Sequence, residues 1–159
     1  LKHFFYMPAA KRYFNRQDQQ AIAHAVEQAE QGHAGEIQVV IEGHIPAHQA
    51  YFQDTRARAQ QLFAELGVWD TEFNSGVLLY LNLCERKVEI VIDRGIKSAT
   101  QQQVWDSICQ DVIGQMAQHQ YRQAMLQGVF EIGKVLADFY QHSRLDVKNE
   151  LGNVPIILE

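Results

Sequence analysis

Residues 74–96 read Asn-Ser-Gly-Val-Leu-Leu-Tyr-Leu-Asn-Leu-Cys-Glu-Arg-Lys-Val-Glu-Ile-Val-Ile-Asp-Arg-Gly-Ile. Two apolar runs, residues 77–83 and 88–92, flank a charged connection at residues 84–87. Short apolar runs rich in β-branched residues and joined by a tight polar connection are typical of a β-hairpin. A hairpin folds the chain back on itself, so the residues before its first strand and after its second strand are expected to lie side by side.

The mouth of this hairpin collects oxygen-bearing side chains, which are the ligands that Ca²⁺ and Mg²⁺ prefer. The start of a parallel first strand would bring one more carboxylate to the same end of the sheet. The predicted cation ligands are Asp70, Asp93, Glu72, Asn74 and Glu36. A second interpretation stays open, because loops collect Asp and Asn for turn formation alone. Ligands of open α/β sheets also bind mostly beyond the carboxyl ends of parallel strands, which is the opposite end.

Length and composition indicate one domain over residues 1–159, with a core at about 15–142 and a tail at 143–159. Apolar residues make up 47% and charged residues 21% of the chain, which is typical of a soluble globular protein. The net charge of −5 disfavours binding to nucleic acid, which needs clustered Lys and Arg.

Cys84 and Cys109 are expected to be free thiols. No apolar run approaches the roughly 20 residues of a membrane span. The cytoplasm is the expected compartment, or the periplasm if a signal peptide has been removed.

The order of the remaining patterns predicts a three-layer α/β/α sandwich with a small mixed sheet. The sequence predicts a strand at 35–43 and helices at 15–32, 51–66, 101–118 and 121–142. Asn15 and Asp18 form a capping-box pair at the start of the leading helix. The first strand should pair parallel with the second through a right-handed crossover, and the hairpin then adds an antiparallel strand. The apolar run 154–158 either docks on the body or adds an edge strand.

Several motifs in this order resemble the TPM-domain family, which includes thylakoid-lumen and bacterial phosphatase-like repair domains. They are Gly35-Glu-Ile, Leu62-Phe-Ala-Glu-Leu-Gly67, Ser75-Gly-Val-Leu-Leu-Tyr80, Asp93-Arg-Gly-Ile96 and Tyr121. The resemblance covers residues 15–141 and indicates the branch without a membrane tail. It implies an α/β/α sandwich. It further implies either acid-phosphatase activity, with divalent cations near the hairpin mouth, or a non-enzymatic role in membrane-protein assembly or repair.

The chain departs from the family pattern at two places that bear on a cation. Ser75-Gly76 stands where Asn-Gly is common, with Asn74 one place earlier, and glutamines at 101–103 stand where an aspartate is often present. Both changes remove oxygen ligands and weaken the case for a phosphatase.

Other patterns carry less chemistry. His44 and His48 flank Pro46 in a loop without further zinc ligands. The serines lie in no nucleophile elbow, and no phosphate-binding glycine loop is present. The aromatic residues near the N-terminus either pack on the body or form a partner surface; they are Phe4, Phe5, Tyr6, Tyr13 and Phe14.

Two functions therefore compete. In the favoured one, the domain binds a protein partner or membrane-protein client and is regulated by a divalent cation at the hairpin mouth. In the alternative, it is a metal-dependent acid phosphatase acting on phosphomonoesters. Asp93 or Asp70 would then orient the ion or a water, and Arg94 and Lys97 are the cations nearest in sequence.

Overall fold

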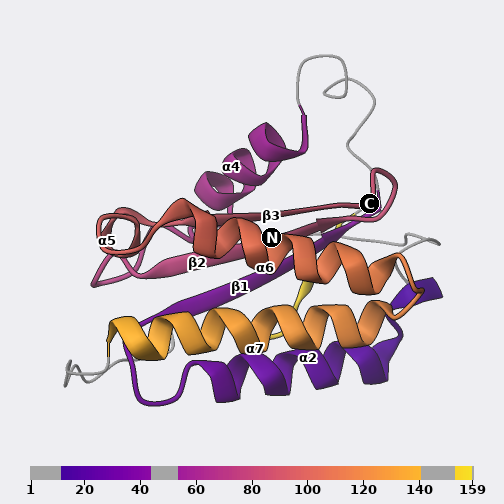
Figure 1. Ribbon diagram of the computed structural model, residues 1–159, viewed down its shortest axis with the longest axis horizontal. Helices are drawn as coiled ribbons and strands as arrows, with labels where there is room; N and C mark the ends of the chain where they lie inside the picture. The colour runs from indigo at the N-terminus through magenta and orange to yellow at the C-terminus, as the bar shows by residue number, and fades with distance from the viewer. Residues whose placement is uncertain (1–11, 44–53, 141–152, 159) are drawn as a thin grey trace.

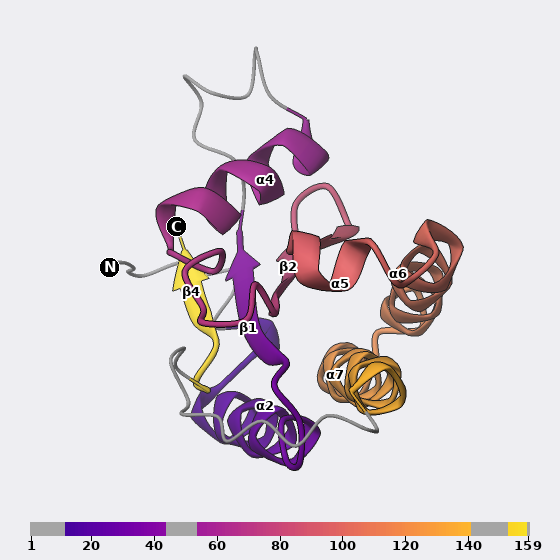
Figure 2. The ribbon, with the colours of Figure 1, turned by 90° about the vertical axis from the view of Figure 1, so that its left-hand side faces the viewer.

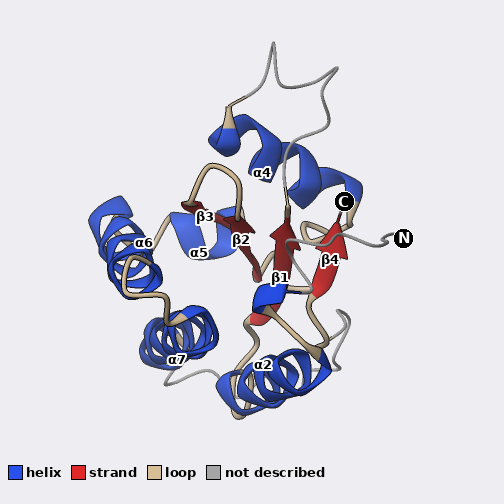
Figure 3. Ribbon diagram, turned by 90° about the vertical axis from the view of Figure 1, so that its right-hand side faces the viewer, coloured by secondary structure: helices blue, strands red, loops and turns tan. Residues whose placement is uncertain are grey.

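The computed structural model describes residues 12–43, 54–140 and 153–158. Within them, strands β1 (Glu36–Glu42), β2 (Gly76–Asn82), β3 (Lys87–Ile92) and β4 (Ile156–Leu158) form one sheet in the order β3-β2-β1-β4. Helix α4 (Thr55–Glu65) covers one face of this sheet (Figure 1). Helices α2 (Arg16–Ala29), α6 (Gln102–Met116) and α7 (Tyr121–Phe139) lie on the other face (Figure 3). The predicted α/β/α sandwich is confirmed.

The pairing of the strands confirms the predicted mixed sheet. β1 pairs parallel with β2, from Glu36 opposite Gly76 to Glu42 opposite Asn82. β3 runs antiparallel to β2, as the hairpin pattern predicts. The apolar run near the C-terminus adopts the edge-strand alternative, because β4 pairs parallel with Val40–Glu42 of β1.

The helix ends follow from local capping chemistry. Asn15 Oδ1 accepts the N–H of Asp18 at 2.8 Å, and Asp18 Oδ2 accepts the N–H of Asn15 at 3.0 Å, so the predicted capping box is present. Asp54 caps α4 by accepting the N–H of Ala57 at 2.7 Å. The start predicted for that helix, residues 51–53, lies outside the described residues.

One short element was not predicted. Helix α5 (Arg94–Lys97) follows β3 directly and takes Asp93 as its N-cap. Four residues are too few to show a helical period in the sequence.

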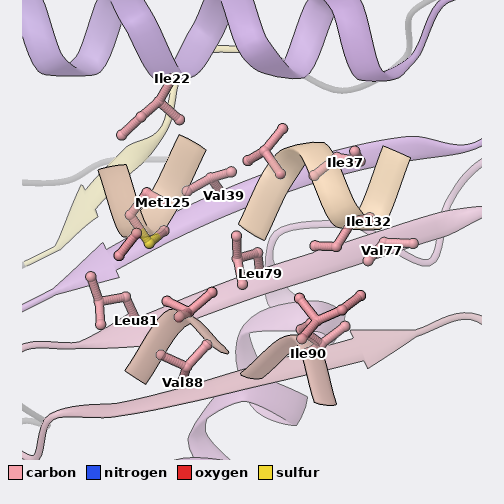
Figure 4. Close-up of a cluster of buried hydrophobic side chains, with 14 of the residues drawn as sticks. Ile22, Ile37, Val39, Val77, Leu79, Leu81, Val88, Ile90, Met125 and Ile132 are labelled. Carbon is pink, nitrogen blue, oxygen red and sulfur yellow. The ribbon is translucent and has the colours of Figure 1, made fainter. Parts of the chain in front are cut away.

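Every residue of β1 and β2 is buried, which fits their nearly continuous apolar sequences. Because side chains alternate along a strand, the sheet serves two cores. Ile37, Val39 and Ile41 pack with α2, α6 and α7, and Figure 4 shows Ile37 and Val39 in this core. Val40, Leu78 and Tyr80 pack with α4 on the other face.

Candidate functional site at the hairpin mouth

The structure brings the start of β1 and the end of β3 to one end of the sheet, on either side of the start of β2. Figure 2 shows β1, β2 and helix α5, which follows β3, from this end. Asp93 donates its N–H to the carbonyl of Gly76 at 3.0 Å, and Glu36 lies opposite Gly76 in the register. Glu36 donates its own N–H to the carbonyl of Ser75 at 3.1 Å. The backbone hydrogen bonds therefore confirm that the segments before β2 and after β3 lie side by side.

The loop before β2 is held against this end by glycines and by Ser75. A Cβ at Gly76 would lie 2.0 Å from the carbonyl oxygen of Val68, and one at Gly95 would lie 2.5 Å from that of Asn74. Ser75 donates its hydroxyl to the carbonyl of Ala34 at 2.8 Å. Only glycine permits these close approaches, so the loop at 68–75 has little room to move away from the sheet.

The predicted ligands divide into a buried pair and a more exposed set. Asp93 is 9% exposed and Glu36 is 2% exposed. Asn74 is half-buried with φ at +53°, while Asp70 and Glu72 are exposed. Across residues 12–43, 54–140 and 153–158, no three or more His, Cys, Asp and Glu side chains are grouped to hold a metal ion.

Asp93 presents one satisfied and one unsatisfied carboxylate oxygen. Its Oδ1 accepts the N–H of Arg94 at 2.7 Å. Its Oδ2 is buried and has no hydrogen-bond partner among the described residues. A buried carboxylate oxygen without a partner is unfavourable, which makes this atom the one that most needs a positively charged or hydrogen-bonding neighbour.

Three further titratable side chains, Glu30, Tyr140 and His33, lie near this end of the sheet, and no sequence motif pointed to them. Glu30 Oε2 accepts the N–H of Ile37 at 2.7 Å. Burial raises the pKa of Glu30 to about 7. The hydrogen bond from Ile37 lowers this pKa, and the nearby Glu36 carboxylate raises it further. Tyr140 shares a hydrogen bond with the side chain of Ser75, and its pKa is raised by burial and by Asp93.

The third of these, His33, is fixed between backbone groups. Its Nδ1 accepts the N–H of Gly35 at 3.0 Å, so its Nε2 carries the proton and donates to the carbonyl of Ala29 at 2.5 Å. The ring stacks on Tyr140 with centroids 6.1 Å apart. Burial lowers the pKa of His33, and both its nitrogens serve the fold.

The remaining predicted residues have clear places or lie outside the described chain. Cys84 and Cys109 are free thiols, as predicted. Arg94 and Lys97 are exposed on α5. Tyr13 and Phe14 pack with the main core, whereas Phe4, Phe5, Tyr6, His44 and His48 fall outside the described residues. No described helix is long and apolar enough to cross a membrane.

A second polar cluster, which no sequence pattern predicts, is buried at the carboxyl ends of β1 and β2. The guanidinium of Arg58 donates to both carboxylate oxygens of Glu42, at 3.0 and 2.7 Å. The hydroxyl of Tyr80 donates to Glu42 Oε1 at 2.6 Å and accepts from Asn82 at 3.0 Å. These groups satisfy one another, which indicates a structural role.

Known proteins share the sequence features and the fold of this chain. Residues 9–135 match the family model of the TPM domain. The structure is similar to the BA42 protein of the psychrophilic bacterium Bizionia argentinensis, with a TM-score of 0.78, 25% identity, and coverage of 95% of this chain and 99% of that one. It shares its fold with the N-terminal domain of a P. gingivalis protein, with a TM-score of 0.69, 19% identity, and coverage of 84% and 83%. No curated protein sequence matches. The chain belongs to the TPM-domain family.

Proposed function

We propose that this domain is a binding module whose hairpin mouth takes up a divalent cation, Ca²⁺ or Mg²⁺, and so regulates its attachment to a protein partner such as a membrane-protein client. The unsatisfied, buried Oδ2 of Asp93 carries this proposal. An unsatisfied polar group of this kind costs about 1–3 kcal/mol, and more when it is charged. A bound cation would remove that cost.

The side chains at the mouth fit a hard cation in type and in charge. Asp93 and Glu36 are two carboxylates at one end of the sheet, and both are buried. Two buried negative charges repel each other, and a divalent ion would offset both. Asn74 could add an amide oxygen, while Asp70 and Glu72 could act from the exposed loop, directly or through water. Calcium accepts such mixed sets of carboxylates, carbonyls and waters.

An exposed aromatic side chain next to these residues offers a contact for the partner. Trp69 directly precedes Asp70 and is 52% exposed. Its indole N–H donates to the carbonyl of Ala64 at 3.0 Å, which orients the ring. Tryptophan is enriched among the residues that dominate binding energy at protein interfaces. A cation held by the same loop would stabilise the position of this contact.

The phosphatase alternative is favoured by one observation, the exposed Arg94 and Lys97 on helix α5, which begins after Asp93. Two cations beside a metal-bound phosphate would stabilise the charge that develops during hydrolysis. Ser75 offers no nucleophile for such a reaction, because it is 1% exposed and donates to a backbone carbonyl. Any hydrolysis would therefore use water activated by the ion.

Thermal unfolding in Ca²⁺, Mg²⁺ or Mn²⁺ tests the cation site. Asp93→Asn keeps an oxygen that can cap α5 and removes the charge. Asp54→Asn is the matched control, because Asp54 also caps a helix. It is the N-cap of α4 and is not one of the residues of the hairpin mouth. At about 100 times the Kd, the bound ion should raise the Tm of wild type and Asp54→Asn by roughly 5–10 °C. Asp93→Asn should show no rise.

Two further experiments distinguish the binding module from the phosphatase. Cation-dependent retention of a partner from a lysate of the source organism should be lost in Trp69→Ala, which keeps the rise in Tm. Hydrolysis of a phosphomonoester that disappears in Asp93→Asn, and persists in Asp54→Asn, would support the phosphatase in place of the binding module. A wild-type Tm that no ion shifts would refute the cation site itself.

A further inference from the structure

A second candidate site lies at the opposite end of α7 from the hairpin mouth (Figure 1). A cavity of about 690 Å³ opens where the residues before α2 meet the connection between α6 and α7. Arg12, Tyr13, His119, Tyr121 and Arg122 line it, together with three glutamines and Leu126. The 19 residues of α7 separate it from the mouth by about 28 Å, so the two sites share no residue.

Among the residues that the structure describes, those lining this cavity include no acidic side chain, although the chain carries 19 acidic and 14 basic residues. It contains two guanidinium groups, an imidazole, two phenols and three amides, all of which can donate hydrogen bonds. Guanidinium groups match carboxylate and phosphate oxygens in a planar, two-pronged geometry. The cavity therefore has the chemistry of an anion site on a protein whose net charge is negative.

The neighbouring Asp18 forms a long ion pair with Arg122 and leaves about half of that side chain exposed. Its Oδ1 lies 3.8 Å from Arg122 Nη1, which is beyond hydrogen-bond distance. Its Oδ2 accepts the N–H of Asn15 in the capping box. The Arg122 side chain is 54% exposed and lines the cavity, so its guanidinium is accessible to a ligand.

The aromatic wall of the cavity is already in place. The rings of Tyr13 and Tyr121 lie 4.3 Å apart at an interplanar angle of 34°. The buried Phe14 meets the ring of Tyr121 edge-on at 6.4 Å. A rigid wall lowers the cost of ordering side chains when a ligand binds.

His119 is held in the cavity by an unfavourable backbone conformation. Its φ is +61°, in the left-handed region that favours glycine. It donates its N–H to Met116 O at 2.9 Å, and Gln120 donates to Gln115 O at 3.1 Å. This is the hydrogen-bond pattern at a helix end where glycine is the usual residue. Strain of this kind in a non-glycine residue often marks a functional position.

We propose that this cavity binds a small organic polyanion, a molecule with at least two carboxylate or phosphate groups. Arg12 and Arg122 pair with its oxyanions, and His119 donates from the connection between α6 and α7. The volume lies within the range of small-molecule sites and far exceeds what a single inorganic ion fills. Two arginines favour a ligand with more than one anionic group.

Calorimetric titration with pyrophosphate and, separately, with citrate tests this proposal, in EDTA and at low salt. The better ligand distinguishes the phosphate from the carboxylate class. Wild type should bind, and Arg122→Gln should weaken binding roughly tenfold or more through loss of charge-assisted hydrogen bonds. Lys87→Gln is the matched control, since Lys87 is an exposed cation outside the cavity; it should bind as wild type does.

His119→Gly separates a binding role from a structural one. Glycine relieves the strain at this φ, so the variant should have a higher Tm than wild type and bind the anion more weakly. Asp93→Asn should bind the anion normally, which keeps this test independent of the proposed cation site. The proposal is overturned if neither probe binds wild type at about 10 mM, or if Arg122→Gln and His119→Gly both retain full affinity.

Discussion

At the scale of single residues, the surroundings of His33 predict how the stability of the protein depends on pH. The ring is 7% exposed, and its Nδ1 accepts the N–H of Gly35. Protonation at Nδ1 would break that bond and bury a charge, which is why burial lowers the pKa of His33. In the unfolded chain a histidine titrates near pH 6.5. Below about that pH the unfolded state therefore binds more protons, and the free energy of unfolding must fall as the pH falls.

Replacing His33 with glutamine should remove this contribution. Glutamine cannot satisfy both backbone groups, so we expect a loss of about 1–3 kcal/mol at pH 8. Between pH 7.5 and 5 the variant should lose less further stability than wild type. Glu30 titrates in the same window with the opposite sign, but it is present in both proteins and cancels in the difference. Urea unfolding at several pH values measures this, with the exposed His24→Gln as control. Equal pH dependence in His33→Gln and wild type would contradict the assignment.

The predictability of single residues depends on how far apart their partners lie in the sequence. The pairing of Asn15 and Asp18 could be predicted because the two residues are three positions apart. The stacking of His33 on Tyr140 could not, because it joins the end of α7 to a loop far earlier in the chain. Asp93 was placed correctly at the mouth, but its role as the cap of α5 required a helix too short to recognise.

At the scale of elements, the buried ion pair between Arg58 and Glu42 fixes α4 on the sheet. Glu42 is fully buried, and its carboxylate is fully hydrogen-bonded to Arg58 and Tyr80. Removing one partner of such a pair leaves an uncompensated charge in the core. We therefore expect Arg58→Met to lower the free energy of unfolding by about 3–5 kcal/mol.

Two comparisons test this role. Adding Glu42→Gln to Arg58→Met should recover part of the loss, because the orphaned charge is then gone. Arg56→Gln on the same helix should cost about 1 kcal/mol or less, since Arg56 is 40% exposed beside Glu89. Urea unfolding of these variants, and of Glu42→Gln alone, gives the values. Losses that simply add in the double variant would show that the two side chains are not coupled.

The sequence predicted the apolar part of α4 and missed its polar part. Ala59 and Leu62 are buried as expected, and Phe63 and Leu66 are partly buried. Phe52 of the predicted stripe lies outside the described residues. Arg58 was not recognised, because a charged residue in a helix usually faces solvent. Its burial is compensated mainly by Glu42 on the strand beneath it, and strand-to-helix contacts of this kind are not visible in a local pattern.

At the scale of the whole molecule, the order of apolar runs was enough to predict the sheet. A buried strand, a helix and a hairpin leave few alternatives once crossovers are right-handed. The hairpin mouth was also predictable, since a hairpin brings its own flanks together. The cavity at the start of α7 was not predictable. Its lining brings residues 12–13 together with residues 118–126, and α2 and the first three strands lie between them in the sequence. Sites built from one supersecondary unit are readable in sequence, whereas sites built between units require the packed structure.

The C-terminal strand yields the last prediction, since it closes one edge of the sheet. β4 pairs with Val40–Glu42 of β1, and Gly43 donates its N–H to Leu158 O at 3.2 Å. Ile156 and Leu158 pack on the core beneath α4. Deleting residues 153–159 would expose the backbone of a β1 segment whose side chains are all buried. An exposed, flat, apolar edge pairs readily with another chain.

We therefore expect the truncated chain to melt about 5–10 °C lower and to associate with itself at concentrations where the full chain does not. Thermal unfolding and light scattering during gel filtration measure the two effects. Ile157→Ala is the control, because it keeps the strand backbone while removing part of a side chain packed on the main core; it should lower the Tm without causing association. A truncated chain that stays monomeric would mean that β1 is protected by something other than β4. If such a chain is also destabilised, β4 contributes packing, and only association shows that β4 protects the edge of the sheet.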